Sequence, residues 1–326
     1  MSGQSRGRQG PAYADVWGVQ DPWGATVTET QGERETRPPP AETFETYRPL
    51  LFAIAYRMLG SATEAEDVVQ DAYLRFQATP PESIRSAKAF LSTVVTRLCL
   101  DQIQSARARR ESYVGPWLPE PLLTEALDAA PAPADRVTQA ESISMAFLVL
   151  LESLTPLERA VFLLHEVFDY GYDDVAAIVG RSEPACRQLY RRARQHVLER
   201  RPRFPAAPAE QERLTATFLR ACERGDLDEL TGLLAEDVTL WSDGGGKVRA
   251  ALRPIHGRDA VARFIVGILS KAPPGFRVQH TAVNGAPGIV SYVNDRPIAA
   301  LALETDGRRI HGLRLVANPD KLARLQ

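Results

Sequence analysis

The hydrophobic period changes along this 326-residue chain, and that change limits what the chain can fold into. Up to about residue 204 the apolar residues recur at the three- and four-residue spacing of amphipathic helices. From about residue 210 they alternate in short runs such as VTLWSD, KVRAALRPI and GIVSYV, which predicts strands. The pattern therefore predicts two all-α domains followed by an α+β domain that contains a curved antiparallel sheet.

Proline-rich stretches separate these blocks. The first 40 residues show no sustained period and end in three prolines, which is typical of a disordered tail. A segment with five prolines between the helical blocks predicts an extended linker. The expected tail, first helical domain, linker, second helical domain and C-terminal domain occupy residues 1–40, 41–113, 114–138, 139–204 and 210–326.

Several classes of protein are excluded by composition. No apolar run approaches the roughly 20 residues that a membrane span needs, and the N-terminus lacks the apolar core of a signal peptide. We therefore expect a cytoplasmic protein without a membrane partner. Cys99, Cys186 and Cys222 are widely separated, so they predict buried thiols rather than a disulfide scaffold or a zinc site.

A basic helix stands out although the net charge of the whole chain is only −2. Between positions 181 and 203 there are eight arginines and two glutamates, so this stretch carries a net charge of +6. A short helix ending at Gly180 and a second helix capped by Ser182 have the spacing of a helix-turn-helix. The alternative is an arginine-rich solvated helix, but such a helix normally includes more acids. We therefore expect DNA binding.

The face of this second helix can be predicted from its period. Cys186, Tyr190, Ala193 and Val197 share one face and should pack inward. Residues suited to base edges then point outward, and further arginines are placed for phosphates. The predicted DNA-binding residues of this block are Arg181, Ser182, Arg187, Gln188, Arg191, Arg192 and Arg194.

The first helical block carries two candidate surfaces. The helix DVVQDAYLRF exposes Asp67, Gln70 and Asp71, and its like-charged pair favours a basic partner over the alternative of a polar face with Asp71 paired to Arg75. The third helix is expected to expose residues suited to gripping a nucleic-acid strand before a basic end. These residues are Lys88, Thr96, Arg97, Asp101, Gln102, Arg107, Arg109 and Arg110.

At this point the chain resembles a known family. FETYRPLLFAIAYRMLGSATEAEDVVQDAYLRF and AFLSTVVTRLCLDQIQSARARRE resemble region 2 of an extracytoplasmic-function (ECF) sigma factor, and LTPLERAVFLLHEVFDYGYDDVAAIVGRSEPACRQLYRRARQHV resembles region 4. WLPEPL, DGGGK and NPDKL resemble the ECF group that has a fused SnoaL-like domain of the NTF2 fold. The resemblance covers all of the chain except the tail.

The resemblance implies a role for each surface. Asp67, Gln70 and Asp71 match the helix that binds the β′ clamp helices of core RNA polymerase, and the β flap is a second implied contact. Arg97, Asp101 and the basic end match the face that reads the −10 element, although this helix has few exposed aromatics to capture a flipped base. Region 4 is implied to read the −35 element. The resemblance therefore implies core RNA polymerase and promoter DNA as partners, with an unidentified small ligand left open for the C-terminal domain.

The motif WLPEPL lies in the linker. It needs a neighbouring surface, because an extended segment held by prolines cannot bury its apolar residues by itself. It could pack on region 2 or region 4, but the resemblance favours the C-terminal domain, near DGGGK and NPDKL, where it would regulate in cis. The residues expected in this inter-domain site are Trp117, Leu118, Pro119, Asp243, Gly244, Gly245, Gly246, Lys247, Asn318, Pro319 and Asp320.

The C-terminal domain is expected to have no catalytic residue, metal or cofactor. DGGGK lacks the spacing of a phosphate loop, and its position between two strand patterns predicts a hairpin tip. Histidines 256, 280 and 311 are scattered on strands without an evident acid partner. Two other functions stay open. One is a one-component regulator with a ligand-sensing domain, although such a regulator would not need the acidic helix DVVQDAYLRF. The other is a SnoaL-like enzyme tethered to DNA.

Overall fold

The computed structural model describes residues 40–124, 143–200 and 207–325, and it describes no side chains for residues 106–111. The tail predicted for residues 1–40 therefore lies almost entirely outside the described residues, as do the side chains of Arg107, Arg109 and Arg110. Within the described ranges, no helix is both long and apolar enough to cross a bilayer.

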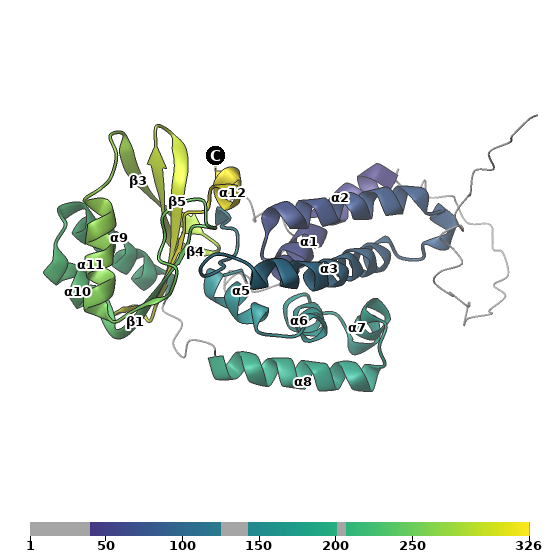
Figure 1. The fold of residues 1–326 in the computed structure, drawn as a ribbon. Coiled ribbons are helices and arrows are strands. Elements are labelled where there is room, and N and C mark those ends of the chain that lie inside the picture. The colour runs from purple at the N-terminus through teal and green to yellow at the C-terminus, as the bar shows by residue number, and fades with distance from the viewer. Residues whose placement is uncertain (1–39, 125–142, 201–206, 326) are drawn as a thin grey trace, which may run out of the picture. The chain divides into compact units, whose positions relative to one another are not determined.

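Three helices form the first block (Figure 1). They are α1 (Pro40–Leu59), α2 (Ala62–Ala78) and α3 (Ala87–Glu111), with a short 3-10 helix η1 (Pro81–Ser83) before α3. Gly60 ends α1 in the left-handed conformation, with φ of 68°. The hydroxyl of Ser61 then accepts a hydrogen bond from the backbone N–H of Glu64 and so caps α2.

The second block has four helices and a π-helical turn. They are α5 (Met145–Glu152), α6 (Pro156–Phe162), the π turn η3 (Leu163–Val167), α7 (Tyr172–Val179) and α8 (Glu183–Arg200). Thr155 and Glu158 form a complete capping box at the start of α6, with Pro156 in its first turn. The apolar faces of both helical blocks merge into one continuous core, so the first block packs directly on the second.

The C-terminal part is a six-stranded sheet with helices on one face (Figure 1). Its helices are α9 (Pro208–Arg224), α10 (Leu227–Leu233) and α11 (Arg258–Leu269), and its strands are β1 (Leu234–Asp243), β2 (Ile255–His256), β3 (Phe276–Val283), β4 (Ala286–Val293), β5 (Arg296–Thr305) and β6 (Ile310–Val316). A short helix α12 (Pro319–Leu322) and a 3-10 turn η4 (Ala323–Leu325) follow.

The sheet is mixed rather than wholly antiparallel. Its strand order is β2-β1-β6-β5-β4-β3, and β1 runs parallel to β6 while the other neighbours are antiparallel. The strand expected over KVRAALRPI is wrong for most of its length, because only Ile255 and His256 pair with β1. The preceding residues form an exposed connection instead, so DGGGK lies in a turn that directly follows β1.

Both faces of the sheet are buried. On one face Leu240, Ile289 and Leu313 pack against α9, α10 and α11. On the other face Val290 and Val316 pack with Leu118 of the linker and with the C-terminal turn. Alternation along each strand explains this division, since successive side chains point to opposite faces. The second face therefore brings the linker into contact with the C-terminal domain.

Candidate functional site

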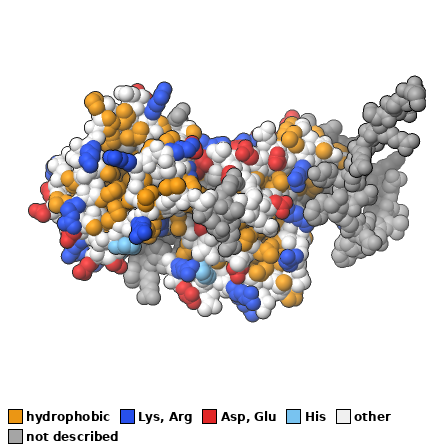
Figure 2. Space-filling view, in the orientation of Figure 1, with side chains coloured by type: hydrophobic (Ala, Val, Ile, Leu, Met, Phe, Trp, Pro, Cys, Tyr) orange, Lys and Arg blue, Asp and Glu red, His pale blue; other side chains and the backbone are white. Residues whose placement is uncertain are grey.

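The outer face of α8 carries the arginines that the sequence predicted. Cys186, Ala193 and Val197 are buried on the inner face, as expected, and Tyr190 is half-buried. The exposed positions of α8 include Arg187, Gln188, Arg191, Arg192 and Arg194. Arg181 and Ser182, just before the helix, are also exposed. Figure 2 shows Lys and Arg side chains along the lower edge of the molecule, where Figure 1 places α8.

A groove of about 570 Å³ runs along this face. Its lining mixes three guanidinium groups with two phenol rings and one leucine, namely Tyr172, Arg187, Tyr190, Arg191, Arg194 and Leu198, together with Gln195 and Glu199. The guanidinium carbon of Arg187 lies 4.3 Å from the centre of the Tyr172 ring. Sequence reasoning missed Tyr172, because nothing local indicates that α7 places its ring against α8.

The acidic face of α2 is exposed. Asp67, Gln70 and Asp71 all face solvent, and Leu74, one turn further along, is 55% exposed although it is a large apolar residue. The alternative pairing of Asp71 with Arg75 is not present as an ion pair in the part of the chain that the structure describes. An acidic stripe with an exposed leucine suits a protein partner that is basic at its rim and apolar at its centre.

The N-terminus of α2 is also held by the linker. The carboxylate of Glu120 accepts hydrogen bonds from the Ser61 hydroxyl at 3.0 Å and from the Thr63 backbone N–H and hydroxyl at 3.1 and 3.2 Å. Glu120 is only 2% exposed, and a buried carboxylate at a helix N-terminus is stabilised by the unpaired N–H groups there. The linker thereby completes the cap of the helix that carries the acidic face.

The DNA-facing side predicted for α3 is partly covered by the second helical block. Arg97 donates hydrogen bonds to the carbonyl oxygens of Ile178 and Ala177, at the C-terminal end of α7. Thr96 was expected to be exposed and is fully buried, which is a correction: α6 and α7 pack on this part of α3. Asp101, one turn further along, is exposed as expected.

Further contacts join α3 to the second block. The Ser92 and Tyr170 hydroxyls lie 2.7 Å apart, and the Lys88 ammonium lies 5.1 Å from the centre of the Tyr170 ring. On α6, the buried Arg159 donates to the carbonyl oxygen of Met58 at 2.7 Å and to the Glu152 carboxylate at 2.8 Å. The two helical blocks are thus joined by hydrogen bonds as well as by apolar packing.

A buried carboxylate joins the linker, the DGGGK turn and the C-terminal helix. Asp243 is fully buried. Its Oδ1 accepts from the Tyr113 hydroxyl at 2.6 Å and the Gly245 N–H at 3.1 Å, and its Oδ2 accepts from the Leu118 N–H at 2.9 Å and the Lys321 ammonium at 2.7 Å. Burial and the bond to Asp243 raise the pKa of Tyr113, so its hydroxyl stays a donor.

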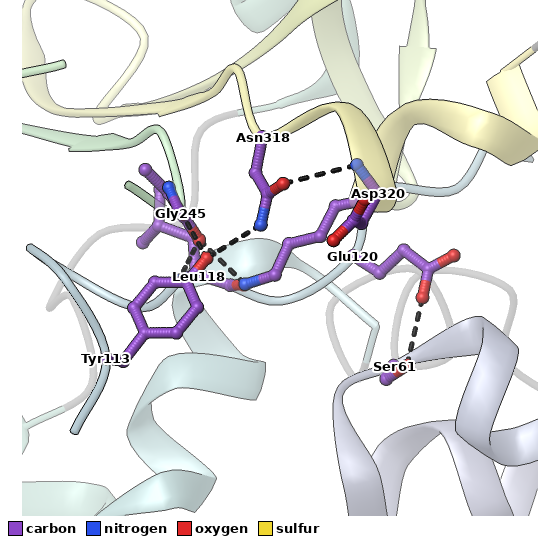
Figure 3. Close-up of polar contacts among 9 residues, drawn as sticks. Ser61, Tyr113, Leu118, Glu120, Gly245, Asn318 and Asp320 are labelled. Carbon is purple, nitrogen blue, oxygen red and sulfur yellow. Dashed lines mark hydrogen bonds and ion pairs between the residues drawn. The ribbon is translucent and has the colours of Figure 1, made fainter. Parts of the chain in front are cut away.

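Asn318 and Lys321 extend this network (Figure 3). The Asn318 side chain donates to the Tyr113 hydroxyl at 2.9 Å and caps α12 by accepting the Asp320 N–H. Lys321 also lies 4.4 Å from the centre of the Trp117 ring, and Lys247 pairs with Asp320 at the surface. We name Tyr113, Leu118, Asp243, Asn318 and Lys321 the junction.

The remaining predicted inter-domain residues lie at or next to the junction. Gly245 and Gly246 have positive φ values of 60° and 72°, and a Cβ on Gly245 would lie 2.3 Å from the Asn318 side chain. Gly244, Pro119 and Pro319 are parts of the turn, the linker and α12. Sequence reasoning named most of these positions. It included Lys321 only as part of NPDKL, without a role, and it missed Tyr113, whose partners lie in other segments.

Asn284 makes a second contact between the parts of the chain. It lies in the β3–β4 turn, is fully buried and has a positive φ of 52°. Its side-chain oxygen accepts the Leu122 N–H at 3.0 Å, and its amide donates to the Tyr56 hydroxyl at 2.6 Å and the Ile143 carbonyl at 2.9 Å. One residue therefore bonds to the first helical block, the linker and the start of the second block.

The three histidines of the C-terminal domain do not converge. His280 faces Glu212 at 3.3 Å, His311 faces Asp306 at 3.0 Å, and His256 lies 3.1 Å from the Thr239 hydroxyl. Within the described ranges, no cluster of three or more acidic, histidine or cysteine side chains could hold a metal. All three cysteines are free, Cys99 and Cys186 are buried, and Cys222 is only partly buried.

Comparison with known proteins identifies each part of the chain. Residues 43–109 match Sigma-70 region 2, residues 144–197 match Sigma-70 region 4, and residues 215–314 match a SnoaL-like domain. The ECF RNA polymerase sigma factor SigJ of Mycobacterium tuberculosis is 39% identical over 289 residues, which cover 85% of this chain and 91% of SigJ. The probable ECF sigma factor SigI of the same species is 33% identical and covers 87% of this chain and 95% of its own length.

The fold agrees with these matches. The crystal structure of Mycobacterium tuberculosis SigJ superposes with a TM-score of 0.67 and 35% identity, covering 86% of this chain and 97% of that one. The order of the parts is the same as the order that the sequence predicted, with two helical sigma regions followed by the mixed sheet. The chain therefore belongs to the ECF family of RNA polymerase sigma factors, and its C-terminal part is a SnoaL-like domain.

Proposed function

We propose that this sigma factor directs core RNA polymerase to promoters with three separate surfaces. The acidic face of α2 docks the clamp helices of the β′ subunit, the α3 face reads the −10 element, and the outer face of α8 reads the −35 element while region 4 contacts the β flap. The exposed arginines of α8 support the last assignment, because a recognition helix needs its free side chains at the N-terminal half.

The SnoaL-like domain acts in cis by holding the sigma regions in a closed arrangement. The observation that carries this proposal is the buried Asp243, whose carboxylate accepts hydrogen bonds from the linker, the DGGGK turn and Lys321. A buried ionised group is costly to leave unpaired, so these three segments stay together until the whole group of contacts is released.

The closed arrangement also covers part of the −10 face. Arg97 is engaged with the C-terminal end of α7, and Thr96 is buried. Thr96 is not accessible to a base or phosphate while region 4 packs on α3, and Arg97, although exposed, has its Nε and Nη2 groups bonded to α7. Opening of region 4 from region 2 is therefore a step before the −10 element is read, and polymerase binding would supply the free energy for it.

Run-off transcription with purified core polymerase tests this function. The wild-type chain should give promoter-dependent transcripts. Asp243→Asn removes the charge that faces Lys321 and should raise transcription when polymerase is limiting, since it weakens the closed state. Asp295→Asn is the matched control, because it makes the same change in an exposed turn between β4 and β5 of the same domain and leaves the junction intact.

Three outcomes would contradict parts of the proposal. Absence of promoter-dependent transcripts from the wild-type chain would contradict the assignment of surfaces. Equal transcription by Asp243→Asn and Asp295→Asn would remove the cis role of the junction. Lower transcription by Asp243→Asn would mean that the junction supports the active state rather than the closed one.

SnoaL-like domains share a fold with enzymes, but sigma factors are not enzymes, and we propose no reaction for this one. Its three histidines engage separate partners on different elements. The sheet face away from its helices is covered by the linker and the C-terminal turn rather than left open to a substrate. The tethered-enzyme alternative predicts turnover by the full chain, which a substrate screen would detect.

A further inference from the structure

Arg187 differs from the other arginines of α8 in what surrounds it. Its guanidinium carbon lies 4.3 Å from the centre of the Tyr172 ring, and one of its nitrogens lies 3.4 Å from Glu183. An arginine over an aromatic face is attracted to it, while its N–H groups stay free in the plane of the guanidinium. The Tyr172 ring therefore restricts the conformations of the Arg187 side chain without accepting hydrogen bonds from its N–H groups.

Tyr172 is itself held firmly. It begins α7, and its ring packs on His165 with 4.1 Å between ring centres and meets Tyr190 edge-on at 6.0 Å. His165 is fixed in turn by a 2.9 Å contact between its Nδ1 and the carbonyl oxygen of Tyr170. The aromatic group of Tyr172, His165 and Tyr190 thus forms one wall against which Arg187 rests.

The π-helical turn connects this aromatic group to α8. Residues 163–167 form a π-helical turn, in which the backbone hydrogen bond spans five residues instead of the four of an α-helix, and such turns occur often at functional sites. The turn contains both His165 and Glu166, and the carboxylate of Glu166 accepts the hydroxyl of Tyr190. Burial and this hydrogen bond raise the pKa of Tyr190 to about 12, so the phenol stays neutral beside the arginines.

We propose that Tyr172 is a positioning residue for DNA recognition: its ring fixes the Arg187 guanidinium so that its fork of N–H donors faces a guanine in the major groove. This inference rests on the proposed function of α8 and deepens it. Bidentate contact between arginine and the O6 and N7 atoms of guanine needs a planar, oriented donor pair. Arg192, which is exposed and does not line the groove, lacks such a support.

The preference for guanine should therefore depend on Tyr172, although Tyr172 itself does not contact the base. Replacing Tyr172 with leucine should cut the preference for guanine at one position about two- to fivefold, which corresponds to the strength of an exposed cation–π pair. Tyr172→Phe keeps the ring and should keep the preference. Binding to DNA without the site should hardly change, because phosphate contacts from the other arginines remain.

A double-mutant cycle on the full-length chain tests this. Each variant is bound to a pool of DNA duplexes that is randomised over one turn of the helix, and the bound fraction is sequenced to give base preferences. The variants are Tyr172→Leu, Tyr172→Phe, Arg187→Ala and the combination of Tyr172→Leu with Arg187→Ala. The matched cycle combines Tyr172→Leu with Arg192→Ala.

If Tyr172 acts through Arg187, the leucine variant should lose guanine preference in the wild-type background and lose nothing more in the Arg187→Ala background. In the Arg192→Ala background, Tyr172→Leu should reduce the guanine preference by as much as it does in the wild type. Equal losses in both backgrounds would show that Tyr172 only supports the fold and would overturn the inference, while the proposed function of α8 would stand. If Arg187→Ala itself leaves all base preferences unchanged, the assigned face of α8 is wrong and the inference is overturned with it.

Discussion

Single buried polar residues carry much of the contact between the parts of this protein. Asp243, Glu120 and Asn284 are each at most 2% exposed, and each bonds to a segment distant in sequence. Removing one partner from such a group leaves the others without hydrogen bonds, which is more costly than the bond itself. Small changes at these positions should therefore have large effects.

Asn284→Gly should lower the stability of the full chain by about 3 kcal/mol, because three buried hydrogen bonds to other segments are lost. Glycine keeps the positive φ, so backbone strain does not contribute. Urea unfolding followed by tryptophan fluorescence measures the change. Asn294→Gly is the control, since Asn294 has a φ of 49° in an exposed turn and should change stability little. Similar effects of the two variants would contradict the importance of the side-chain bonds.

Asp306 makes the stability of the C-terminal domain depend on acid pH. Burial acts to raise its pKa, but hydrogen bonds from the Arg309 and Arg308 N–H groups and from His311 outweigh this and lower the pKa from 3.8 to about 2. A lowered pKa in the folded state means that the stabilisation is complete above pH 3.8 and is lost as the pH falls toward 2. Asp306→Asn should remove this part of the acid sensitivity in thermal unfolding, and an unchanged pH profile would contradict it.

At the level of helices, α2 and α8 each present one polar face that the fold does not use. The inner sides of both helices join the common core. Their outer sides carry opposite charges, acidic on α2 and basic on α8, which suits partners of opposite charge. Each face can therefore be changed without disturbing the core, which allows separate tests.

Asp67→Arg combined with Asp71→Arg should abolish association with core polymerase and leave the fold intact, because both side chains are exposed. Co-purification with core polymerase measures binding, and circular dichroism checks the fold. Glu223→Arg with Glu236→Arg is the control, since it makes the same change of charge at exposed positions of the C-terminal domain. Retention of core binding by the α2 variant would show that the docking face is elsewhere.

Arginines along α8 should separate into two groups. Arg191→Ala should cost about 1–3 kcal/mol at the promoter site and relax base preference at one position. Arg194→Ala should weaken binding to all sequences alike and reduce the salt dependence of binding. Binding of the full chain to matched and mismatched duplexes at several salt concentrations distinguishes the groups. Sequence-independent losses for both variants would mean that the recognition face is rotated from the one assigned here.

For the molecule as a whole, the linker is the element that connects the sigma regions to the C-terminal domain. It contacts α1 and α2 through Glu120, and it contacts the sheet through Leu118 and Asp243. The second helical block joins the same assembly at Asn284 and along α3. Weakening the contacts of the linker with any one of these parts should therefore alter several binding surfaces at once.

A disulfide between Val114→Cys and Gly246→Cys tests this arrangement in solution. A Cβ at position 246 would lie 3.3 Å from the Cβ of Val114, which is close to the separation of a disulfide. The φ of 72° at Gly246 strains a cysteine there, so circular dichroism first checks that the double variant folds. Oxidation should then cross-link the folded free protein, and the electrophoretic mobility shift of the product measures it. The single variants are controls for pairing with the native cysteines, of which Cys99 and Cys186 are buried and Cys222 is only partly buried. Failure to cross-link would contradict the position of the linker against the DGGGK turn.

The sequence by itself determined the local structure. The change of period separated helical from strand-forming parts, Gly60 and Gly180 ended helices in the left-handed conformation, and Thr155 with Glu158 marked the start of α6. Such features depend on neighbours within a few residues, so a single sequence contains them. Family motifs also predict which surfaces face DNA and polymerase, and those assignments stay predictions.

Only the tertiary structure decided which of these surfaces are covered. Thr96 lies on α3 where the sequence predicted exposed residues, yet region 4 buries it, and the neighbouring Arg97 stays exposed but donates hydrogen bonds to α7. Asn284 and Tyr172 carry no local signal, because the partners that matter, Tyr56 for Asn284 and Arg187 for Tyr172, lie in other elements. The parallel pairing of β1 with β6 could not be predicted from the sequence for the same reason. Burial and hydrogen bonding between distant segments depend on the whole packing arrangement, which no local pattern specifies.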